Sequence, residues 1–565
     1  MAGAGANLWL EALGAAAGGC LRDELFATPL HAARLNRPLV PGLAGVSGPK
    51  GFRPADAALG RGILDGEWVL ADQTLALPQG GDPWNRPSPS RTFAAQLHRM
   101  DWLGDLIAAG EPGTAEALRQ VLAWRRLFGR WNAFVWRPDI LDRRVFNLAC
   151  HIHALAAIAS EREGQRLAET LAAQARHLMR LDDALPRAAE RLTAAAVAAV
   201  SIAGAPGDQM LDPLLPRLGL AVERAVLADG AHASRSPQAG LELLLDLLTL
   251  DDGLSRLGRE PQEKITHAID RLTAAARFFT RVDGRLSAFH GGEPGSAAQV
   301  AAARAQERQG GGDNPLTDLP HGGYQRMAGP HLSVMVDAGA PAQGGWSLEA
   351  CGQPGAIEIM AGRDRLVEAS PWGLGEDRPQ ALRLAPAGST ASLGTGEAGA
   401  PLGGFLARAL GPRLVRAAAQ VEVWRHEGEE GVWVELAHDG WREAFGLIHE
   451  RRLFLSRQQD ELRGEDRFSP RGPAASPRVL AAQVSFLLNP KAQALVSRDQ
   501  RSVLIRGRDS GGWWLRHDAG EVALEPAVLL RRGVVVHSSR IVLRGRLRAD
   551  EGGRVRWKLA AAEPA

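Results

Sequence analysis

The fold of this chain is indicated first by a stretch that reads V-L-A-D-G-A-H-A-S-R-S-P-Q-A-G, from Val226 to Gly240. The Asp229-Gly230 pair is typical of a tight turn, which predicts a polar loop between two helical segments. His232 follows this turn by two residues, so its imidazole could lie at the rim of the loop. Arg235 is the second chemically versatile side chain of the loop, because a guanidinium can bind a carboxylate through two parallel hydrogen bonds.

Apolar residues recur at helical spacing on both sides of this loop, from Ser90 to about Thr280. Helices of this length with short connections pack as antiparallel pairs, and a series of pairs can close into an α/α toroid. We therefore expect an (α/α) toroid over residues 90–290, preceded by an N-terminal extension and lead-in over residues 1–89. The predicted helices are Thr92–Ala109, Thr114–Phe128, Arg143–Ser160, Glu163–Leu181, Leu185–Ile202, Leu211–Ala228, Leu241–Leu250 and Gln262–Thr280.

The second half of the chain has a different pattern. Residues 291–320 are rich in Gly, Ala and Gln and predict a linker or lid. Short alternating segments with turn residues follow, and they predict an antiparallel β-sandwich over residues 321–565. Helices first and strands afterwards indicate an α+β multidomain protein rather than a βαβ sheet. The predicted strands are His331–Asp337, Gln420–Arg425, Gly431–Leu436, Gly446–Leu455, Val479–Leu488, Ser502–Arg506, Val522–Leu524 and Arg540–Leu543.

Composition supports a two-domain globular protein. A chain of 565 residues is too long for one ordinary core, and 45% hydrophobic with 23% charged residues is typical of globular proteins. The formal net charge is only +2, and the chain has no block of Lys or Arg. Nucleic acid is therefore not an expected partner.

The cysteines and the N-terminus exclude several further classes. Cys20, Cys150 and Cys351 are far apart and odd in number, which predicts buried free thiols rather than disulfides or a zinc site, and we expect no metal or cofactor. The first 19 residues have no Lys or Arg and contain Glu11, so they lack the basic region of a secretory signal. No apolar run is long enough for a membrane span. The cytoplasm is the default expectation.

Several motifs carry a resemblance when they are taken together. They are D-G-x-x-x-x-R-S-P from Asp229 to Pro237, W-x-x-x-x-x-x-R-R-x-x-N from Trp136 to Asn147, D-G-R-L-S-A-F from Asp283 to Phe289, G-G-Y-Q-R from Gly322 to Arg326, and H-E-R-R-L-F-L-S with L-R-G-E-D-R between His449 and Arg467. In this order, over most of the chain, they resemble the heparinase II/III family of polysaccharide lyases, in a bacterial branch. Many members of that family are exported, so the periplasm or cell envelope is the alternative location.

The chain departs from the family where the family carries its reactive residues. The family loop continues with a Tyr-His pair, but this chain has Ala239 and Gly240, which cannot titrate. Family members carry A-H-A-G and A-H-S-T early in the β domain, whereas this chain reads A-Q-G-G at 342–345 and A-G-S-T at 387–390. A later F-H-L-H-P strand reads F-L-L-N-P at 486–490.

The resemblance implies β-elimination on a uronate-containing anionic polysaccharide. This reaction needs a group that neutralises the uronate carboxylate, a base for the C5 proton and an acid for the departing O4. His232 is the candidate base and Arg235 the candidate carboxylate clamp; a loop-stabilising histidine and an arginine that pins the loop to Asp229 or Glu223 are the alternatives. Tyr324 is the only tyrosine and could be the acid or base, or could pack the domain junction.

Five residues are candidates for substrate binding. Arg144 and Asn147 lie three apart and share a helix face that could line a cleft, or they could bind backbone carbonyls. Trp131 and Trp136 could stack on sugar rings, although core packing is the alternative for most of the tryptophans between residues 84 and 136. His290 could contact substrate or be a solvated loop histidine.

A hydrolase dyad is a weaker hypothesis. Glu358, Glu368, Glu465 and Asp466 fall on predicted β segments or their ends. Flanking arginines in R-G-E-D-R predict a turn network at Glu465 and Asp466 rather than a dyad across a cleft.

Three functions stay open from the sequence. The chain could be a lyase with a reduced catalytic set, a noncatalytic glycan-binding or envelope-associated pseudoenzyme, or a purely structural protein. Loss of the Tyr-His pair and of the β-domain histidines should lower the activity by orders of magnitude if the usual mechanism applied. This loss favours the pseudoenzyme over the lyase.

Overall fold

The computed structural model describes residues 2–36, 43, 48–260, 262–306, 316–415, 417–418, 420–471 and 478–562. The chain forms two compact units. The first comprises Met1–Val226, Leu241–Thr273 and Ala301–Arg308, and the second Leu227–Gly240, Ala274–Val300 and Gln309–Ala565. Almost all of the loop quoted above therefore belongs to the second unit, although it lies between two helices of the N-terminal half.

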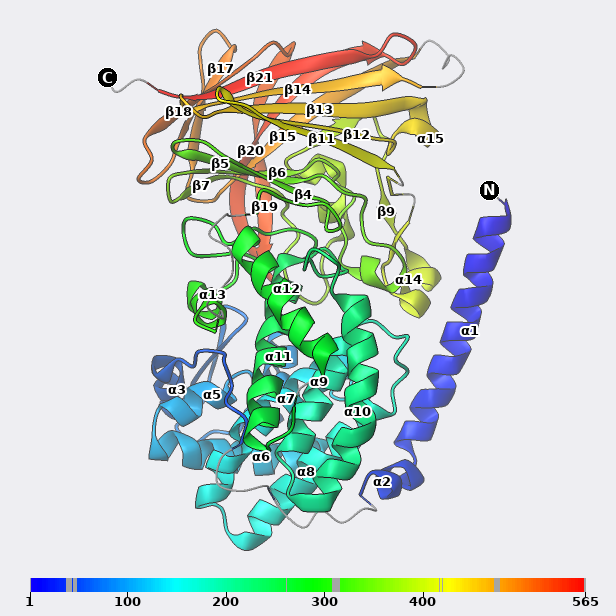
Figure 1. Ribbon diagram of the computed structural model, residues 1–565, viewed down its shortest axis with the longest axis vertical. Coiled ribbons are helices and arrows are strands. Elements are labelled where there is room, and N and C mark those ends of the chain that lie inside the picture. The colour runs from blue at the N-terminus through cyan, green and yellow to red at the C-terminus, as the bar shows by residue number, and fades with distance from the viewer. Residues whose placement is uncertain are drawn as a thin grey trace. The chain divides into compact units, whose positions relative to one another are not determined.

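The N-terminal half is helical, and the predicted α-to-β order is confirmed (Figure 1). Its helices are α1 Ala2–Ala27, α2 Pro29–Asn36, α3 Ala57–Leu64, α4 Arg91–Arg99, α5 Leu103–Ala108, α6 Glu111–Phe128, α7 Pro138–Ile158, α8 Glu161–Met179, α9 Ala188–Val200, α10 Gly204–Ala225, α11 Pro237–Arg256, α12 Glu263–Phe279 and α13 Ala297–Arg304. A hairpin of β1 Glu67–Leu70 and β2 Gln73–Ala76 follows α3.

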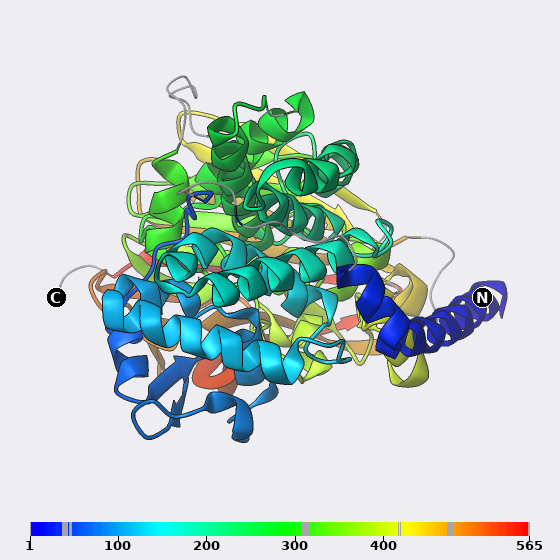
Figure 2. The same ribbon diagram turned by 90° about the horizontal axis from the view of Figure 1, so that it is seen from below.

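Helix α9 is the centre of the first unit. It is buried at every position, and seven of its thirteen residues are alanines. Small side chains let helices approach closely, and α9 packs against α7, α8 and α10. In Figure 2, the helices of this unit, coloured cyan to teal, lie side by side.

The predicted helix Thr92–Ala109 is two helices in the structure. Met100 adopts a left-handed conformation, with φ 59° and ψ 37°, and ends α4. A left-handed residue cannot continue a right-handed helix, so α5 begins only at Leu103. The apolar periodicity continues through the break, which is why the pattern alone predicts one helix.

Helix α1 is an addition to the sequence prediction. It presents large apolar side chains to solvent: Trp9, Leu10, Leu13, Leu21 and Leu25. In the described part of the chain, no helix combines the length and apolarity that crossing a membrane requires. The predicted burial of the thiols holds for Cys351 but is wrong for Cys20, which is exposed on α1, while Cys150 is half-buried.

The predicted linker 291–320 contains regular structure. It includes α13 and the short strand β3, Asp318–Leu319, while its residues 307–315 lie outside the described part of the chain.

The second unit is built on two antiparallel sheets, which appear as stacked layers in Figure 1. One has the order β11-β12-β13-β14-β21-β18-β17-β16, and the other has the order β19-β20-β15-β7-β6-β5-β4-β3, with β8 paired to β15. The strands are β4 Tyr324–Ala328, β5 Leu332–Asp337, β6 Ile357–Ala361, β7 Asp364–Glu368, β8 Ala391–Leu393, β11 Val421–Glu427, β12 Gly431–His438, β13 Leu447–Ser456, β14 Glu461–Pro470, β15 Val479–Leu488, β16 Gln493–Val496, β17 Ser502–Arg506, β18 Gly512–His517, β19 Glu521–Arg531, β20 Val534–Arg548 and β21 Gly553–Ala561. The strands β9 Ala400–Pro401 and β10 Leu414–Val415 form a separate pair, and α14 Gly404–Leu410 and α15 Arg442–Phe445 are short helices.

The core of this unit lies between the two sheets. Alternate residues of facing strands, such as Val334 and Val336 on β5 and Leu453 and Leu455 on β13, belong to one buried cluster. Period-two alternation places these side chains on the inner faces of the two sheets.

The turn network predicted for R-G-E-D-R is wrong. These residues lie within β14, where Asp466 is fully buried and Glu465 faces outward. Their alternation is that of a strand, but consecutive charged residues conceal it in the sequence.

Candidate functional site

Arg235 joins the Val226–Gly240 loop to the β4–β5 region of the second unit. It is 5% exposed and adopts a left-handed conformation, φ 63°, which is uncommon for a residue with a Cβ. Its N–H groups donate to Gly322 O (Nε, 2.7 Å), Gly339 O and Ala340 O (NH1, 3.0 Å each), Gly323 O (NH2, 3.0 Å) and Asp337 Oδ1 (NH2, 2.5 Å). All five donors of the guanidinium are therefore used inside the protein.

Glycine makes this arrangement possible. A Cβ at Gly339 would lie 2.7 Å from Gly323 Cα and 2.8 Å from Arg235 NH2. Any larger residue at position 339 would displace the guanidinium from its carbonyls.

Tyr324 lies beside Arg235 and is fully buried. Its hydroxyl donates a 2.5 Å hydrogen bond to Arg235 O, and the guanidinium carbon lies 4.9 Å from its ring centroid. Phe279 and Phe289 pack on the ring at 4.9 and 5.2 Å. Burial raises the pKa of the phenol well above its ordinary value, so Tyr324 stays protonated.

His290 is buried, and the alternative of a solvated loop histidine is wrong. Its Nδ1 accepts a 3.1 Å hydrogen bond from Cys351 N, and its Nε2 lies 3.0 Å from Asp337 Oδ2. Burial lowers the pKa of His290, and the nearby Asp337 only partly opposes this effect. For Asp337, burial favours the acid, but Arg235 and His290 outweigh it and hold the pKa of the carboxyl low. Asp337 thus connects two of the residues chosen from the sequence.

His232 belongs to the same unit and is 4% exposed. Its Nδ1 lies 2.7 Å from Ser234 Oγ and accepts a hydrogen bond from Ser234 N. The imidazole packs edge-on against Trp346, with centroids 5.5 Å apart. The Ser234 contacts fix the ring within its own loop, as the loop-stabilising alternative expects, and Trp346 adds a contact from outside the loop.

Arg144 and Asn147 lie on α7 in the first unit. Arg144 is fully buried and donates to Gln174 Oε1, His98 O and Val135 O. Asn147 donates 3.0 Å bonds to Arg99 O and Asp101 Oδ1. Both arrangements favour the alternative in which these residues bind carbonyls and other neighbours within the fold.

The two tryptophans proposed as sugar platforms differ. Trp136 is buried, donates to Phe128 O and packs against His177. Trp131 is half-buried, 6.3 Å from the Phe26 ring. Only Trp131 presents part of its indole to solvent.

A buried hydrogen-bond network of polar side chains in the second unit was missed by the sequence analysis. Gly440 N donates to His438 Nδ1, so His438 Nε2 donates to His449 Nδ1 (2.9 Å) and His449 Nε2 donates to Asp466 Oδ1 (2.9 Å). Arg451 Nε and Trp557 Nε1 also donate to this carboxylate. Part of the signal was available, since His449 and Arg451 take inward positions of the predicted strand Gly446–Leu455, whereas His438 and Asp466 lie outside the predicted strands.

The remaining acids of the hydrolase hypothesis are engaged elsewhere. Glu358 pairs with Arg365, and Glu368 with Arg531 and Asn489. Among the described residues, no group of three or more His, Cys, Asp or Glu side chains could hold a metal ion.

Comparison with known proteins identifies the family. The family described as Heparinase II/III-like, C-terminal, matches residues 311–558. FtsZ-localized protein C of Caulobacter vibrioides (strain NA1000 / CB15N) is 46% identical over 564 residues, which cover 99% of this chain and 97% of that protein. The chain belongs to the heparinase II/III-like family.

Solved structures show the same fold at low identity. A crystal structure of heparinase III matches this heparinase-like chain with a TM-score of 0.68 and 14% identity, over 87% of this chain and 81% of the other. A mutant of the heparan sulfate lyase HepC from Pedobacter heparinus matches with a TM-score of 0.59 and 13% identity, over 92% and 87%. At this identity the likeness concerns the fold alone.

Two of the replaced histidine positions are enclosed by other residues of the second unit. A Cβ at Gly388 would lie 2.7 Å from Gln353 Cδ, so an imidazole there would collide with Gln353. Gln353 is held by bonds to Leu382 O and Leu384 O. Leu487 is 1% exposed in the core. The replacements at Gly388 and Leu487 are thus part of the packing of the second unit, whereas Gln343 is exposed.

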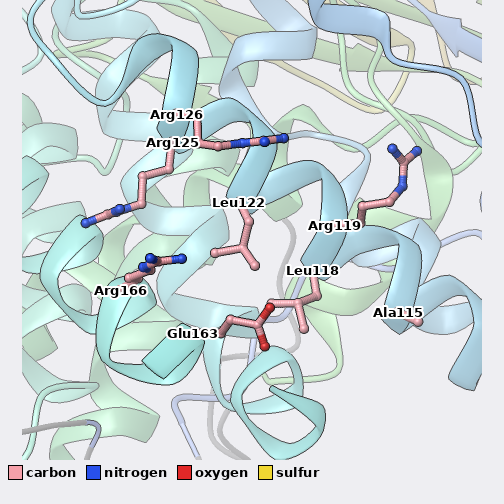
Figure 3. Close-up of a pocket in the computed structure, with 8 residues that line it drawn as sticks. All are labelled: Ala115, Leu118, Arg119, Leu122, Arg125, Arg126, Glu163 and Arg166. Carbon is pink, nitrogen blue, oxygen red and sulfur yellow. The ribbon is translucent and has the colours of Figure 1, made fainter. Parts of the chain in front are cut away.

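The described residues of this heparinase-like protein also line a groove of about 440 Å³ between α6 and α8 (Figure 3). Four arginines surround it, but Figure 3 shows their guanidinium groups pointing in different directions. Arg119 is bound by Glu116, and Arg125 by Glu169 and Thr170. The groove therefore has no convergent set of donors.

The Tyr324→Phe substitution is expected to cost about 1–3 kcal/mol of stability, because Arg235 O would lose its buried donor. Chemical denaturation followed by tryptophan fluorescence measures this loss. Phe279→Leu is the matched control, since it reduces packing on the same ring and leaves the hydrogen bond in place. Unchanged stability in Tyr324→Phe would contradict the anchoring role.

Proposed function

We propose that this chain is a noncatalytic heparinase-like protein that acts by binding, and that it does so at the cell-division site. The noncatalytic role rests on Arg235, because all five of its N–H donors form hydrogen bonds within the protein. A bound uronate carboxylate would have to displace these bonds.

Tyr324 and the replaced Tyr-His positions are also unsuited to the other roles of β-elimination. A base must reach the C5 proton and have a pKa near the working pH. Tyr324 is fully buried, its pKa is raised, and its hydroxyl already donates a hydrogen bond to Arg235 O. Ala239 and Gly240 offer no titratable group at the family's Tyr-His positions. These features support a binding protein over a lyase.

The second part of the proposal rests on a relative. FtsZ-localized protein C is 46% identical across nearly the whole of both chains. By its name, that protein localizes with FtsZ, and we extend this location to the present chain. An anionic glycan is the second ligand class to test, because the family resemblance implies it.

The proposal is tested by pairing an enzyme assay with imaging. Purified protein is incubated with heparan sulfate, hyaluronan, alginate and bacterial exopolysaccharides, and the ultraviolet absorbance of unsaturated uronate is followed against an active heparinase. In parallel, a fluorescent fusion is imaged together with labelled FtsZ in dividing cells. We expect no product with any glycan and a band at mid-cell.

Two results would overturn the proposal. Product formation that is lost in His232→Ala would show a lyase with a rearranged site. If the fluorescent fusion were spread through the cell while the FtsZ ring was normal, the proposed location at the division site would be wrong.

A further inference from the structure

The outer face of the eight-stranded sheet carries a row of side chains that crosses six strands. Neighbouring strands place these residues directly opposite one another, in the order His426, Trp433, Phe454, Arg463, Lys558 and Arg516. On β12, β13 and β21 the residues on either side of the row, such as Val432, Leu453 and Leu559, belong to the buried core. We call this set the cross-strand row. Five of its six members, all but His426, line a groove of about 500 Å³.

One end of the cross-strand row is aromatic. Trp433 is 43% exposed, and its ring lies 4.6 Å from that of Phe454 with the planes tilted by 39°. The guanidinium of Arg463 lies 5.7 Å from the Phe454 centroid, at the border with the charged end. An exposed indole beside a second ring provides a flat apolar surface for an apolar side chain.

The other end of the row is cationic and is not balanced by its neighbours. Arg463, Lys558 and Arg516 stand opposite one another on β14, β21 and β18, and like charges in such positions repel. Glu461 pairs with both Arg463 and Lys558, which leaves a formal charge of +2. Arg516 is exposed, and no acidic partner is found for it among the described residues.

The adjacent row on the same face does not share this excess of positive charge. It reads Glu435, Arg452, Glu465 and Arg556 across β12, β13, β14 and β21, so its charges alternate and cancel. Ion pairs within this row join Arg452 to Glu435 at 3.2 Å and Arg556 to Glu465 at 3.9 Å. Opposite charges thus satisfy one row internally, whereas the cross-strand row keeps an excess of cations.

We propose that the cross-strand row binds an acidic segment of a partner polypeptide. Its carboxylates would lie over Arg463, Lys558 and Arg516, and an adjacent apolar side chain would pack on Trp433 and Phe454. Five strand spacings measure about 24 Å, which an extended chain of about seven residues spans. The inference rests on the proposed function, because it supplies the kind of partner through which a binding protein would act.

The separation of the two ends favours a peptide over an anionic glycan. In a polyuronate every sugar carries both a ring and a carboxylate, so a matching surface would alternate platforms and cations. In the cross-strand row the aromatic and cationic residues are segregated. A polypeptide can place acidic and apolar residues in separate runs.

The test uses full-length protein and a fluorescein-labelled seven-residue peptide with leucines at one end and glutamates at the other. A peptide of the same composition with alternating residues and an oligogalacturonate serve as comparison ligands. Fluorescence anisotropy gives each Kd at low and high salt. We expect the segregated peptide to bind most tightly and to weaken as salt rises.

Charge reversal locates the site. Arg516→Glu is expected to weaken binding of the segregated peptide about tenfold or more. Arg506→Glu is the matched control, because Arg506 is exposed on β17, outside the cross-strand row, and gives the same change in charge. Both substitutions are at exposed positions, so their unfolding curves should match that of the unmodified protein.

Several results would overturn the inference. They are no measurable binding of the segregated peptide, equal binding of the alternating peptide, tighter binding of the oligogalacturonate, or equal losses in Arg516→Glu and Arg506→Glu. If any of these results were found while the fusion still lay at mid-cell and the purified protein still gave no lyase product, the peptide-binding inference would be wrong and the proposed function would stand.

Discussion

Lowering the pH from about 7 to about 5 is expected to remove about 2 kcal/mol of stability for each deeply buried neutral histidine of the first unit. His98 and His177 are the clearest cases, since both are buried and burial lowers the pKa of each to about 3. Trp124 Nε1 donates to His98 Nδ1, and His31 Nε2 lies 3.0 Å from His177 Nδ1. Protonation at these nitrogens would break the contacts.

The sign follows from proton linkage. An unfolded histidine has a pKa of about 6.5 and binds a proton below that pH, whereas the folded state binds it only near pH 3. Stability is therefore fully present above pH 6.5 and is lost as the pH falls toward the folded pKa. His438 and His449 in the second unit act in the same direction, because burial lowers both of their pKa values.

Histidine variants separate the contribution of the buried histidines to the pH dependence of stability from that of the carboxyl groups. Burial raises the pKa of Asp105 to about 6, and this group stabilises the folded state as the pH falls. The measurement is therefore the difference between pH 7 and pH 5 in the free energy of unfolding, compared between the unmodified protein and His98→Asn. We expect the difference to shrink by about 2 kcal/mol in the variant. His267→Asn, at an exposed site, is the control, and an equal change in both variants would refute the buried-histidine explanation.

Replacing Arg235 by Met is expected to destabilise the second unit by about 3–5 kcal/mol. Four backbone carbonyls would each lose a hydrogen-bond donor, although Gly323 O would keep Ala338 N, and Asp337 would stay buried with only His290 beside it. The left-handed backbone of Arg235 is held by the same contacts. The substitution therefore removes the anchor of the whole loop.

Denaturant unfolding of the purified variant measures this loss. Arg285→Met is the control, because Arg285 is an exposed arginine of the same unit. Adding Asp337→Asn to Arg235→Met should restore part of the stability, since no uncompensated carboxylate would then be buried. A substrate-binding arginine would give a different result: Arg235→Met would unfold like the unmodified protein and lose affinity for oligouronates.

The order of helices and strands could be predicted because it depends on local periodicity. The predicted helix Glu163–Leu181 corresponds to α8, Glu161–Met179, and the predicted strand Val479–Leu488 coincides with β15. Amphipathic spacing fixes which face is buried, and this information lies within each segment. The break at Met100 could not be predicted, because a left-handed residue with a bulky side chain is held by its surroundings.

The candidate site was only partly predictable, because it depends on contacts between residues far apart in the sequence. The sequence singled out Arg235, His290 and Tyr324 but could not reveal that Asp337 lies between the first two, because that contact joins residues far apart in the chain. The chain from His438 through His449 to Asp466 likewise depends on the pairing of β12 with β13 and of β13 with β14. Strand register brings these residues together, and register is a property of the sheet.

The second unit is assembled from three separate stretches of chain, and this has a consequence for genetic dissection. No single cut separates it from the first unit. A fragment beginning at residue 311, where the family match starts, would lack Arg235 and His290, and Asp337 would lose both of its partners. Chimeras between relatives would therefore have to transplant the Leu227–Gly240 loop and residues 274–300 together with the sheets that they complete.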